Sequence, residues 1–144
     1  MFSITREFHF CYGHRLLGYD GKCAHPHGHN GRVEITLESE TLDARGMVLD
    51  FSELKRIVND WLEENFDHKM VLAENDPLVP MLAAMHEPMF LMPCPPTAES
   101  LSKLIFDFVR NNGYPVRQVV FWETDKCSAT YHTEKSITSL QPLT

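Results

Sequence analysis

The chain has 144 residues, 43% of them hydrophobic, which is enough for one domain with a substantial core and too little for two ordinary domains. Its net charge of −7 argues against a broad nucleic-acid-binding surface. No apolar run approaches the roughly 20 residues of a membrane-spanning helix. The four cysteines include no Cys-x-x-Cys pair, which would indicate a zinc ribbon. We therefore expect a single cytoplasmic domain over residues 1–144, with reduced cysteines and with neither a membrane nor a nucleic acid as its partner.

Residues 2–14 alternate between apolar and polar side chains, which is typical of a half-buried β-strand. The residues of the apolar parity are Phe2, Ile4, Phe8, Phe10 and Tyr12. His14 shares this parity, so it should lie on the buried face at the end of the strand. His9 has the opposite parity and is expected on the surface.

Residues 23–29, Cys-Ala-His-Pro-His-Gly-His, lead into a second predicted strand. His27 and His29 are two residues apart, so they face the same side of a strand. The apolar residues that continue their parity are Val33, Ile35 and Leu37. If the two strands pair antiparallel, the loop 15–26 places the end of the first beside the start of the second. The imidazoles of His14, His27 and His29 would then converge on one metal ion.

Three neutral imidazoles suit zinc and leave a fourth coordination position open, which is typical of a catalytic rather than a structural site. Ligand type alone leaves copper, nickel or iron as alternatives. An isolated His-x-His pair is more often a polar strand entry, but the third histidine and the nearby thiol favour a metal site. His25 is kept as an alternative ligand, because Pro26 restricts the residue before it and the regular strand should start afterwards.

Two amphipathic helices and a closing hairpin are predicted in the remainder of the chain. Residues 50–66 carry an apolar helical stripe, with Asp50 or Ser52 as the N-cap. Residues 69–96 contain most of the nine prolines and are predicted to be an irregular connection with one short helical turn around 79–85. Thr97 should cap a second helix that ends near Gly113. Residues 116–123 and 129–133 then form the hairpin.

These elements predict an α+β fold with a four-stranded antiparallel sheet and two helices on one face, in the order ββααββ. Such a sheet has open edges, and residues 119–122 are apolar on both faces of their strand. Because open edges and apolar faces are usually covered, we expect a homo-oligomer.

Six short motifs occur in order along most of the chain: residues 10–16 ending in His-Arg-Leu, Cys23-x-x-x-His27-Gly28-His29-Asn30, Asp50-Phe51, Asp67-His68, Pro96-Thr97-Ala98-Glu99, and Trp122-Glu123-Thr124 followed by Ala129 and Tyr131. Together they resemble the 6-pyruvoyltetrahydropterin synthase family, which includes the bacterial 6-carboxytetrahydropterin synthases of the queuosine and 7-deazaguanine pathway. The resemblance implies the tunnelling fold (T-fold) and a homohexamer. In it, trimers close their sheets into a barrel, two trimers stack, and the active sites lie at subunit junctions.

The resemblance places the family's zinc ligands at His14, His27 and His29, its catalytic thiol at Cys23, its aspartate–histidine pair at Asp67 and His68, and its pterin-anchoring glutamate at Glu123. Thr97 and Glu99, in the Pro-Thr-Ala-Glu motif, are candidates for secondary contacts with the substrate, although their simplest role is to begin a helix. Each catalytic assignment has a structural alternative. Cys23 could be an unreactive loop thiol, Asp67 and His68 could simply end a helix, and Glu123 could form a salt bridge that faces outward. In the family's assembly the thiol and the aspartate–histidine pair of one site come from different subunits.

The activity implied is a zinc-dependent lyase that converts 7,8-dihydroneopterin triphosphate to 6-carboxy-5,6,7,8-tetrahydropterin with loss of triphosphate and acetaldehyde. The short spacing from Cys23 to His27 resembles the bacterial enzymes rather than the animal ones. The cations Arg15, Lys22, Arg32 and Lys126 are candidates for binding the triphosphate. The alternatives are a 6-pyruvoyltetrahydropterin synthase or related pterin side-chain lyase, a zinc-dependent hydrolase, and a non-catalytic zinc- or pterin-binding module.

Two departures from the family pattern concern substrate choice. Small residues usually precede the first zinc histidine, whereas this chain has Cys11-Tyr12-Gly13, and the bulky Tyr12 shares the inward parity of His14. A phenol at this position would narrow or repurpose the pocket. The usual Leu-Asn after the Asp-His pair is replaced by Lys-Met-Val-Leu at residues 69–72.

Overall fold

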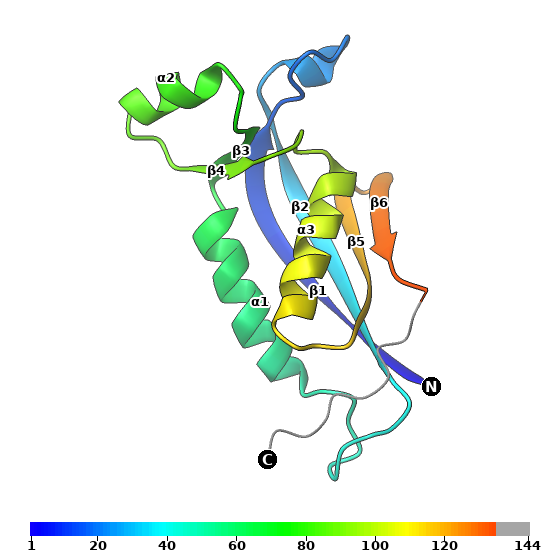
Figure 1. The fold of residues 1–144 in the computed structure, drawn as a ribbon. Coiled ribbons are helices and arrows are strands. Elements are labelled where there is room, and N and C mark those ends of the chain that lie inside the picture. Colours follow the sequence, from blue (N-terminus) through cyan, green and yellow to red (C-terminus); the bar gives the residue numbers. More distant parts are fainter. Residues whose placement is uncertain (135–144) are drawn as a thin grey trace.

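The computed structural model describes residues 1–134, which form a mixed β-sheet with two helices packed against one face (Figure 1). The strands are β1 (Phe2–His14), β2 (His27–Ser39), β3 (Lys69–Ala73), β4 (Met89–Met92), β5 (Val116–Thr124) and β6 (Cys127–His132). The helices are α1 (Phe51–Asn65), α2 (Leu78–Ala84) and α3 (Ala98–Asn111), with a short 3-10 turn, η1, at Lys22–Ala24. The strand order in the sheet is β4-β3-β1-β2-β5-β6.

The two long strands β1 and β2 pair antiparallel over their full length, as the alternation of their residues predicted. The register places His14 opposite His27 and Tyr12 opposite His29. The inward residues of both strands are buried, including Phe8, Phe10, Tyr12, Val33, Ile35 and Leu37. The period of two therefore carries the histidines onto the same face as the hydrophobic core.

Helices α1 and α3 cover this face and begin at the predicted caps. Asp50 accepts a hydrogen bond from the backbone N–H of Ser52 (2.8 Å), and Thr97 accepts one from Ser100 (3.1 Å). The buried helix residues are Leu54, Val58 and Leu62 of α1 and Leu101, Ser102, Ile105, Phe106 and Val109 of α3. The stacked rings of Trp61 and Phe108, with centroids 4.0 Å apart, join the two helices.

The predicted four-stranded antiparallel sheet with two helices was wrong. Residues 69–96 contain β3 and β4, which extend the sheet from the edge of β1 in parallel, and α2 lies between them. The chain order is therefore ββαβαβαββ. The prolines of this segment lie outside the two short strands, and β3 is buried at Val71, Leu72 and Ala73, as a strand with parallel neighbours requires.

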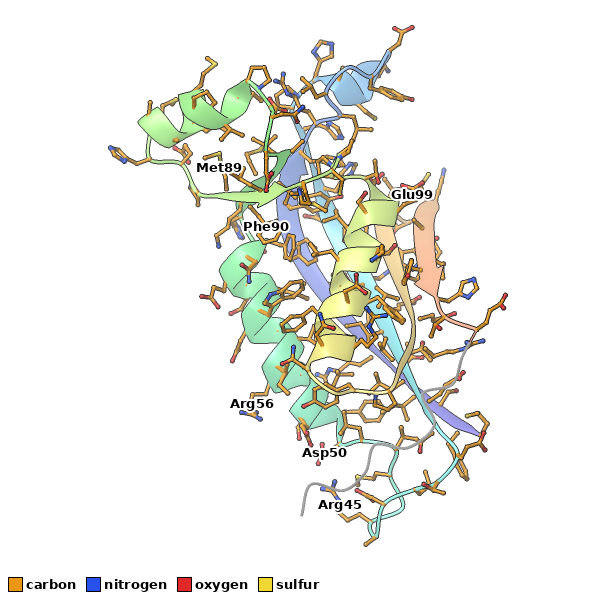
Figure 2. The ribbon with its side chains drawn as sticks, in the orientation of Figure 1. Arg45, Asp50, Arg56, Met89, Phe90 and Glu99 are labelled. Carbon is orange, nitrogen blue, oxygen red and sulfur yellow. The ribbon has the colours of Figure 1, made fainter. Side chains whose placement is uncertain are left out.

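The added strands complete the core at the end of the molecule that holds the histidines. Phe90 of β4 lies in the layer between the sheet and the helices (Figure 2), with its ring 4.5 Å from that of Phe66. Among residues 1–134, no helix is both long enough and apolar enough to cross a membrane.

The face of the sheet opposite the helices is polar. Arg32 lies over the Trp122 ring, 4.5 Å from its centroid, and also contacts Glu7 and Glu34. The Trp122 indole N–H donates to Glu34 (3.2 Å). The outward Trp122 of β5 is thus covered by an arginine of the same chain, and coverage of this face by another subunit stays a prediction.

Candidate active site

Three imidazoles converge where β1 ends and β2 begins. The metal-binding atoms of His14, His27 and His29 all lie within 4.8 Å of one another, and the ring centroids are 4.5 to 5.1 Å apart. The strand register produces this cluster, because His14 pairs with His27 while His29 follows two residues later on the same face. The three donors are close enough together to hold one metal ion.

Backbone carbonyls fix which nitrogen of His14 and of His27 faces the cluster. The Nδ1–H of His14 donates to the carbonyl of Pro96, and that of His27 donates to the carbonyl of His25, both at 2.7 Å. Since a carbonyl only accepts, Nε2 is left as the ligand atom in both rings. The Nε2 atom of His14 is buried and has no hydrogen-bond partner among residues 1–134. The alternative ligand His25 lies outside the cluster and contributes its backbone instead.

Burial favours the neutral form of two of the three imidazoles, His14 and His29. Burial lowers the pKa of His14 to about 4, against the opposing effect of the Pro96 hydrogen bond, and repulsion from His27 and His29 acts in the same direction as burial. Burial also lowers the pKa of His29. Because a metal ion binds the neutral form of histidine, the residues fit a cation such as zinc at neutral pH.

Glu123 and Tyr12 lie directly beside the histidines. A carboxylate oxygen of Glu123, at the end of β5, is 3.8 Å from Nε2 of His14. The Tyr12 ring packs against His14 and His29, with centroids 5.1 and 5.7 Å away. Burial, and then the charge of Glu123, raise the pKa of Tyr12, so its hydroxyl stays protonated.

Asp67 and His68 form a hydrogen-bonded pair just after α1. One Asp67 oxygen accepts the backbone N–H of Cys11 (2.9 Å), and the other lies 2.7 Å from Nδ1 of His68. Burial opposes ionisation, but the Cys11 and His68 hydrogen bonds hold the pKa of Asp67 below its ordinary value. His68 has a left-handed backbone with φ 58°, and its side chain is 79% exposed. The carboxylate therefore orients an imidazole that faces outward.

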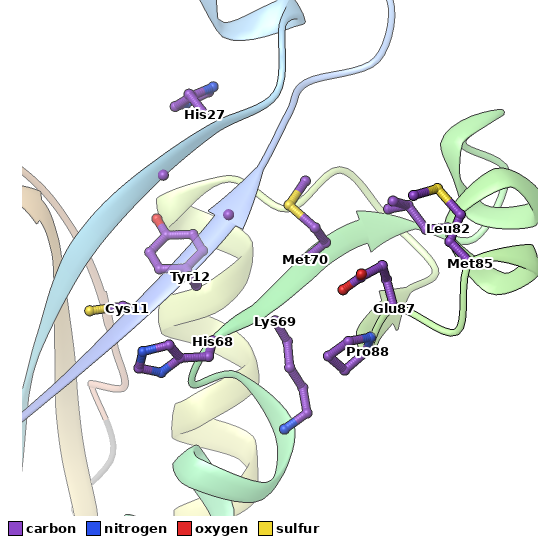
Figure 3. A pocket seen from close by; sticks show the side chains of 12 residues that line it. Cys11, Tyr12, His27, His68, Lys69, Met70, Leu82, Met85, Glu87 and Pro88 are labelled. Atoms are coloured by element: carbon purple, nitrogen blue, oxygen red, sulfur yellow. The ribbon is translucent and has the colours of Figure 1, made fainter.

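His68 and His27 line the same open groove, which has a volume of about 610 Å³ (Figure 3). The other side chains of the groove include Cys11, Tyr12, Lys69, Met70, Leu82, Met85 and Glu87. The groove runs from the metal-binding cluster to the exposed ring of His68. Of the three clustered imidazoles, only that of His27 lines this groove within residues 1–134.

Cys23, Thr97 and Glu99 are not joined to the cluster by any hydrogen bond among residues 1–134. Cys23 lies in η1 with a half-buried free thiol, and its carbonyl accepts the N–H of Leu16 (2.7 Å), which closes the loop onto the end of β1. Thr97 caps α3, and Glu99 is an exposed residue in the first turn of that helix. Their functional roles stay predictions.

The four predicted phosphate-binding cations occupy different environments. Arg15 forms a two-pronged ion pair with the buried Asp76, including an Nε–Oδ2 hydrogen bond of 2.8 Å. Arg32 is engaged on the opposite face of the sheet. Lys22 and Lys126 are exposed, in η1 and in the β5–β6 turn. Asp76 was missed by the sequence reasoning, because a lone aspartate before a proline carries no signal of a partner 61 residues away.

Replacing Asp76 by asparagine is expected to lower the free energy of unfolding by about 2 kcal/mol, because the guanidinium of Arg15 loses its charged partner in a largely buried setting. Urea unfolding measures the change. The matched control is Asp107→Asn, which removes a surface partner of Lys103 and should cost about 0.5 kcal/mol or less.

The same pair makes the stability depend on acid. Hydrogen bonds from Arg15 hold the pKa of Asp76 below its ordinary value of 3.8. A carboxyl with a depressed folded-state pKa stabilises the protein above the unfolded value, and this contribution is lost as the pH falls through the folded value. Below pH 3.8 the native chain should therefore lose more stability than Asp76→Asn. An identical acid dependence in both proteins would contradict this role.

Comparisons with known proteins agree on one family. The model of the family described as 6-pyruvoyl tetrahydropterin synthase matches residues 3–134. A protein of Rickettsia bellii named 6-carboxy-5,6,7,8-tetrahydropterin synthase is 30% identical over 134 residues, covering 88% of this chain and 97% of that protein.

Solved structures share the fold. The crystal structure of an uncharacterized protein from Wolinella succinogenes matches with a TM-score of 0.79 at 28% identity, covering 92% of this chain and 98% of that one. The 6-pyruvoyl tetrahydropterin synthase of Caenorhabditis elegans matches with a TM-score of 0.69 at 22% identity, covering 92% and 96% of the two chains. The second likeness concerns the fold alone.

Proposed function

Because the chain belongs to the 6-pyruvoyl tetrahydropterin synthase family, we propose that it is a 6-carboxy-5,6,7,8-tetrahydropterin synthase, a lyase of the queuosine and 7-deazaguanine pathway. Its substrates are 7,8-dihydroneopterin triphosphate and one water molecule, and its products are 6-carboxy-5,6,7,8-tetrahydropterin, triphosphate and acetaldehyde. The observation that carries the proposal is the cluster of three imidazoles beside Glu123, in a chain whose relatives bear this name.

We assign Zn²⁺ to His14, His27 and His29. Imidazole nitrogens are preferred zinc ligands, and three of them leave one coordination position for the substrate. The buried and unpartnered Nε2 of His14 supports this assignment, since a buried nitrogen without a partner is costly unless a ligand meets it. Bound zinc acts as a Lewis acid that makes protons on the adjacent substrate atoms easier to remove.

The residues around the metal ligands supply proton transfer and orientation. Cys23 as thiolate removes a proton from the substrate side chain. A free thiol has a pKa of about 8.5, so a nearby cation is needed to populate the thiolate at neutral pH. Asp67 holds the Nδ1–H of His68, which leaves the other ring nitrogen to exchange protons with the substrate. The four cysteines are free, which fits a cytoplasmic enzyme.

Substrate binding falls to residues at the edge of the cluster. The Glu123 carboxylate accepts the paired N–H donors at the guanidine-like edge of the pterin, an arrangement that favours charge-assisted hydrogen bonds. Of the four candidate cations, Arg15 and Arg32 form ion pairs within the chain. Lys22 and Lys126 are exposed and bind the triphosphate. Thr97 and Glu99 make secondary contacts near the start of α3.

The active assembly is a homohexamer, a dimer of trimers, in which Cys23 of one subunit meets the Asp67–His68 pair of another. The exposed ring of His68 and the absence of a hydrogen bond from Cys23 to that pair within residues 1–134 support this arrangement. Each site would then be completed only on assembly.

Mixing two inactive variants tests the shared site. Cys23→Ala and His68→Ala should each have greatly reduced turnover. Subunits exchanged between them should recover up to roughly one quarter of the native activity, because one site in four receives both native residues. Activity is measured after joint refolding of equal amounts, and the separately refolded variants serve as the control. No recovery from verified mixed hexamers would contradict a site shared between subunits.

Product analysis tests the activity itself. Incubation of the zinc-loaded protein with 7,8-dihydroneopterin triphosphate is expected to release acetaldehyde and to form the 6-carboxy product, both followed by mass spectrometry. Formation of 6-pyruvoyltetrahydropterin without acetaldehyde would assign the other activity of the family. If a pure zinc-loaded hexamer forms neither pterin product from this substrate, the enzymatic proposal is overturned.

A further inference from the structure

The hydroxyl of Tyr12 is a buried polar group without a partner. The side chain is 3% exposed, and its oxygen makes no hydrogen bond with any residue among 1–134. An unsatisfied buried hydroxyl destabilises a protein, and the great majority of such groups are satisfied in native structures. A phenylalanine would fill the same space without this cost, so the hydroxyl requires an explanation.

Tyr12 is placed at the metal end of the core. Its ring contacts two of the three imidazoles, with a tilted arrangement toward His29 and an edge arrangement toward His14. A carboxylate oxygen of Glu123 lies 3.8 Å from Nε2 of His14, one of the imidazoles that the Tyr12 ring contacts. In Figure 3 the hydroxyl is directed from β1 toward β2, the strand that carries His27. The unpartnered oxygen therefore lies among the groups assigned to the metal and to the pterin.

The neighbouring strand leaves room for this phenol. Gly31 of β2 lies opposite Phe10, and a Cβ added there would be only 3.2 Å from Cε1 of Tyr12 and 3.2 Å from Cζ of Phe121. Such contacts are tighter than almost all that real Cβ atoms make. The Tyr12 ring can therefore pack closely against β2 only because residue 31 has no side chain. This packing holds the ring beside the histidine cluster.

We propose that the Tyr12 hydroxyl is a substrate-binding group that hydrogen-bonds an oxygen of the pterin's side chain and so selects pterins with a hydroxylated side chain. The inference rests on the proposed function. With Glu123 engaged by the pterin ring, the substrate part that reaches the imidazoles is the oxygen-bearing side chain. The unpartnered phenol hydroxyl beside those imidazoles is then a donor available to that side chain.

The test compares two ligands on two proteins. Zinc-loaded native chain and Tyr12→Phe are titrated calorimetrically with 7,8-dihydroneopterin, which has side-chain hydroxyls, and with 6-methyl-7,8-dihydropterin, which has none. The dissociation constant of Tyr12→Phe for dihydroneopterin should rise roughly tenfold, whereas that for the methyl compound should stay within about twofold of native. The zinc content should be unchanged. The melting temperature should be equal or higher, because the variant removes an unsatisfied group.

Tyr114→Phe is the matched control, because the Tyr114 hydroxyl donates to Glu53 (3.1 Å). Tyr114 precedes Val116, which pairs with Leu37 near the end of β2 opposite to His27 and His29. This variant should lose stability and bind both pterins as the native chain does. If Tyr12→Phe binds both ligands like the native chain, or both more weakly by the same factor, the inference is overturned while the proposed function stands. If the native chain binds neither pterin, the proposed function fails and the inference fails with it.

Discussion

Replacing His29 by alanine is expected to remove the metal from the protein and to abolish turnover. Two imidazoles remain, and two ligands do not hold zinc in the three-ligand arrangement of a catalytic site. Removing a residue that only hydrogen-bonds a metal ligand lowers the metal affinity by roughly 10- to 100-fold. His29→Ala removes a ligand itself, so the metal affinity should fall by more than this. The measurement is the metal content per chain after dialysis, by elemental analysis, together with the initial rate.

His29 is a better choice than His14 for this test, because His29 is only half buried, whereas His14 lies in the core and its removal would leave a cavity. His25→Ala is the matched control. Its imidazole lies outside the cluster, and the backbone carbonyl that accepts from His27 is kept. His25→Ala should therefore retain one metal ion per chain. A native metal content in His29→Ala would contradict the assigned ligand set.

The second large effect is expected for Cys23→Ala, which should keep the metal and lose turnover. A positioned base contributes about 10²- to 10⁴-fold to a rate, so kcat should fall by that factor. The thiol is not a member of the metal-binding cluster, so the metal content should equal that of the native chain. Elemental analysis and single-turnover kinetics on the same preparation separate the two effects.

Cys127→Ala provides the control for Cys23, since Cys127 is an exposed free thiol at the start of β6. It should have native turnover and native metal content. Cys23→Ser adds a graded test, because a hydroxyl of the same shape ionises far less readily than a thiol and should restore little activity. Native kcat in Cys23→Ala would show that another group removes the proton.

Local patterns in the sequence were sufficient for the elements built on long periodic segments. Thirteen alternating residues in each of β1 and β2 fixed which side chains face inward, and so placed His14, His27 and His29 on one face. The caps predicted at Asp50 or Ser52 and at Thr97 located the starts of α1 and α3, where Asp50 and Thr97 are the caps, because a cap is a contact between residues two or three positions apart.

Two short strands escaped prediction for a physical reason. β3 and β4 have five and four residues, too few for a period to be recognised, and the prolines around them favour an irregular segment. Both strands pair in parallel, and such pairing gains its hydrogen bonds only through distant contacts. The sheet therefore has two more strands than predicted, because no local sequence pattern indicated them.

The sequence by itself determined the chemistry available at the site: three inward histidines, a nearby thiol, an aspartate–histidine pair and a tyrosine of inward parity. Only the tertiary structure decided how these groups are held. The Pro96 carbonyl that orients His14 is 82 residues away in the chain, and Asp76 pairs with Arg15 across 61 residues. The space for the Tyr12 ring depends on Gly31, which lies on another strand. Periodicity and capping act between near neighbours, whereas ring orientation, ion pairing and close packing depend on segments that meet only when the chain folds.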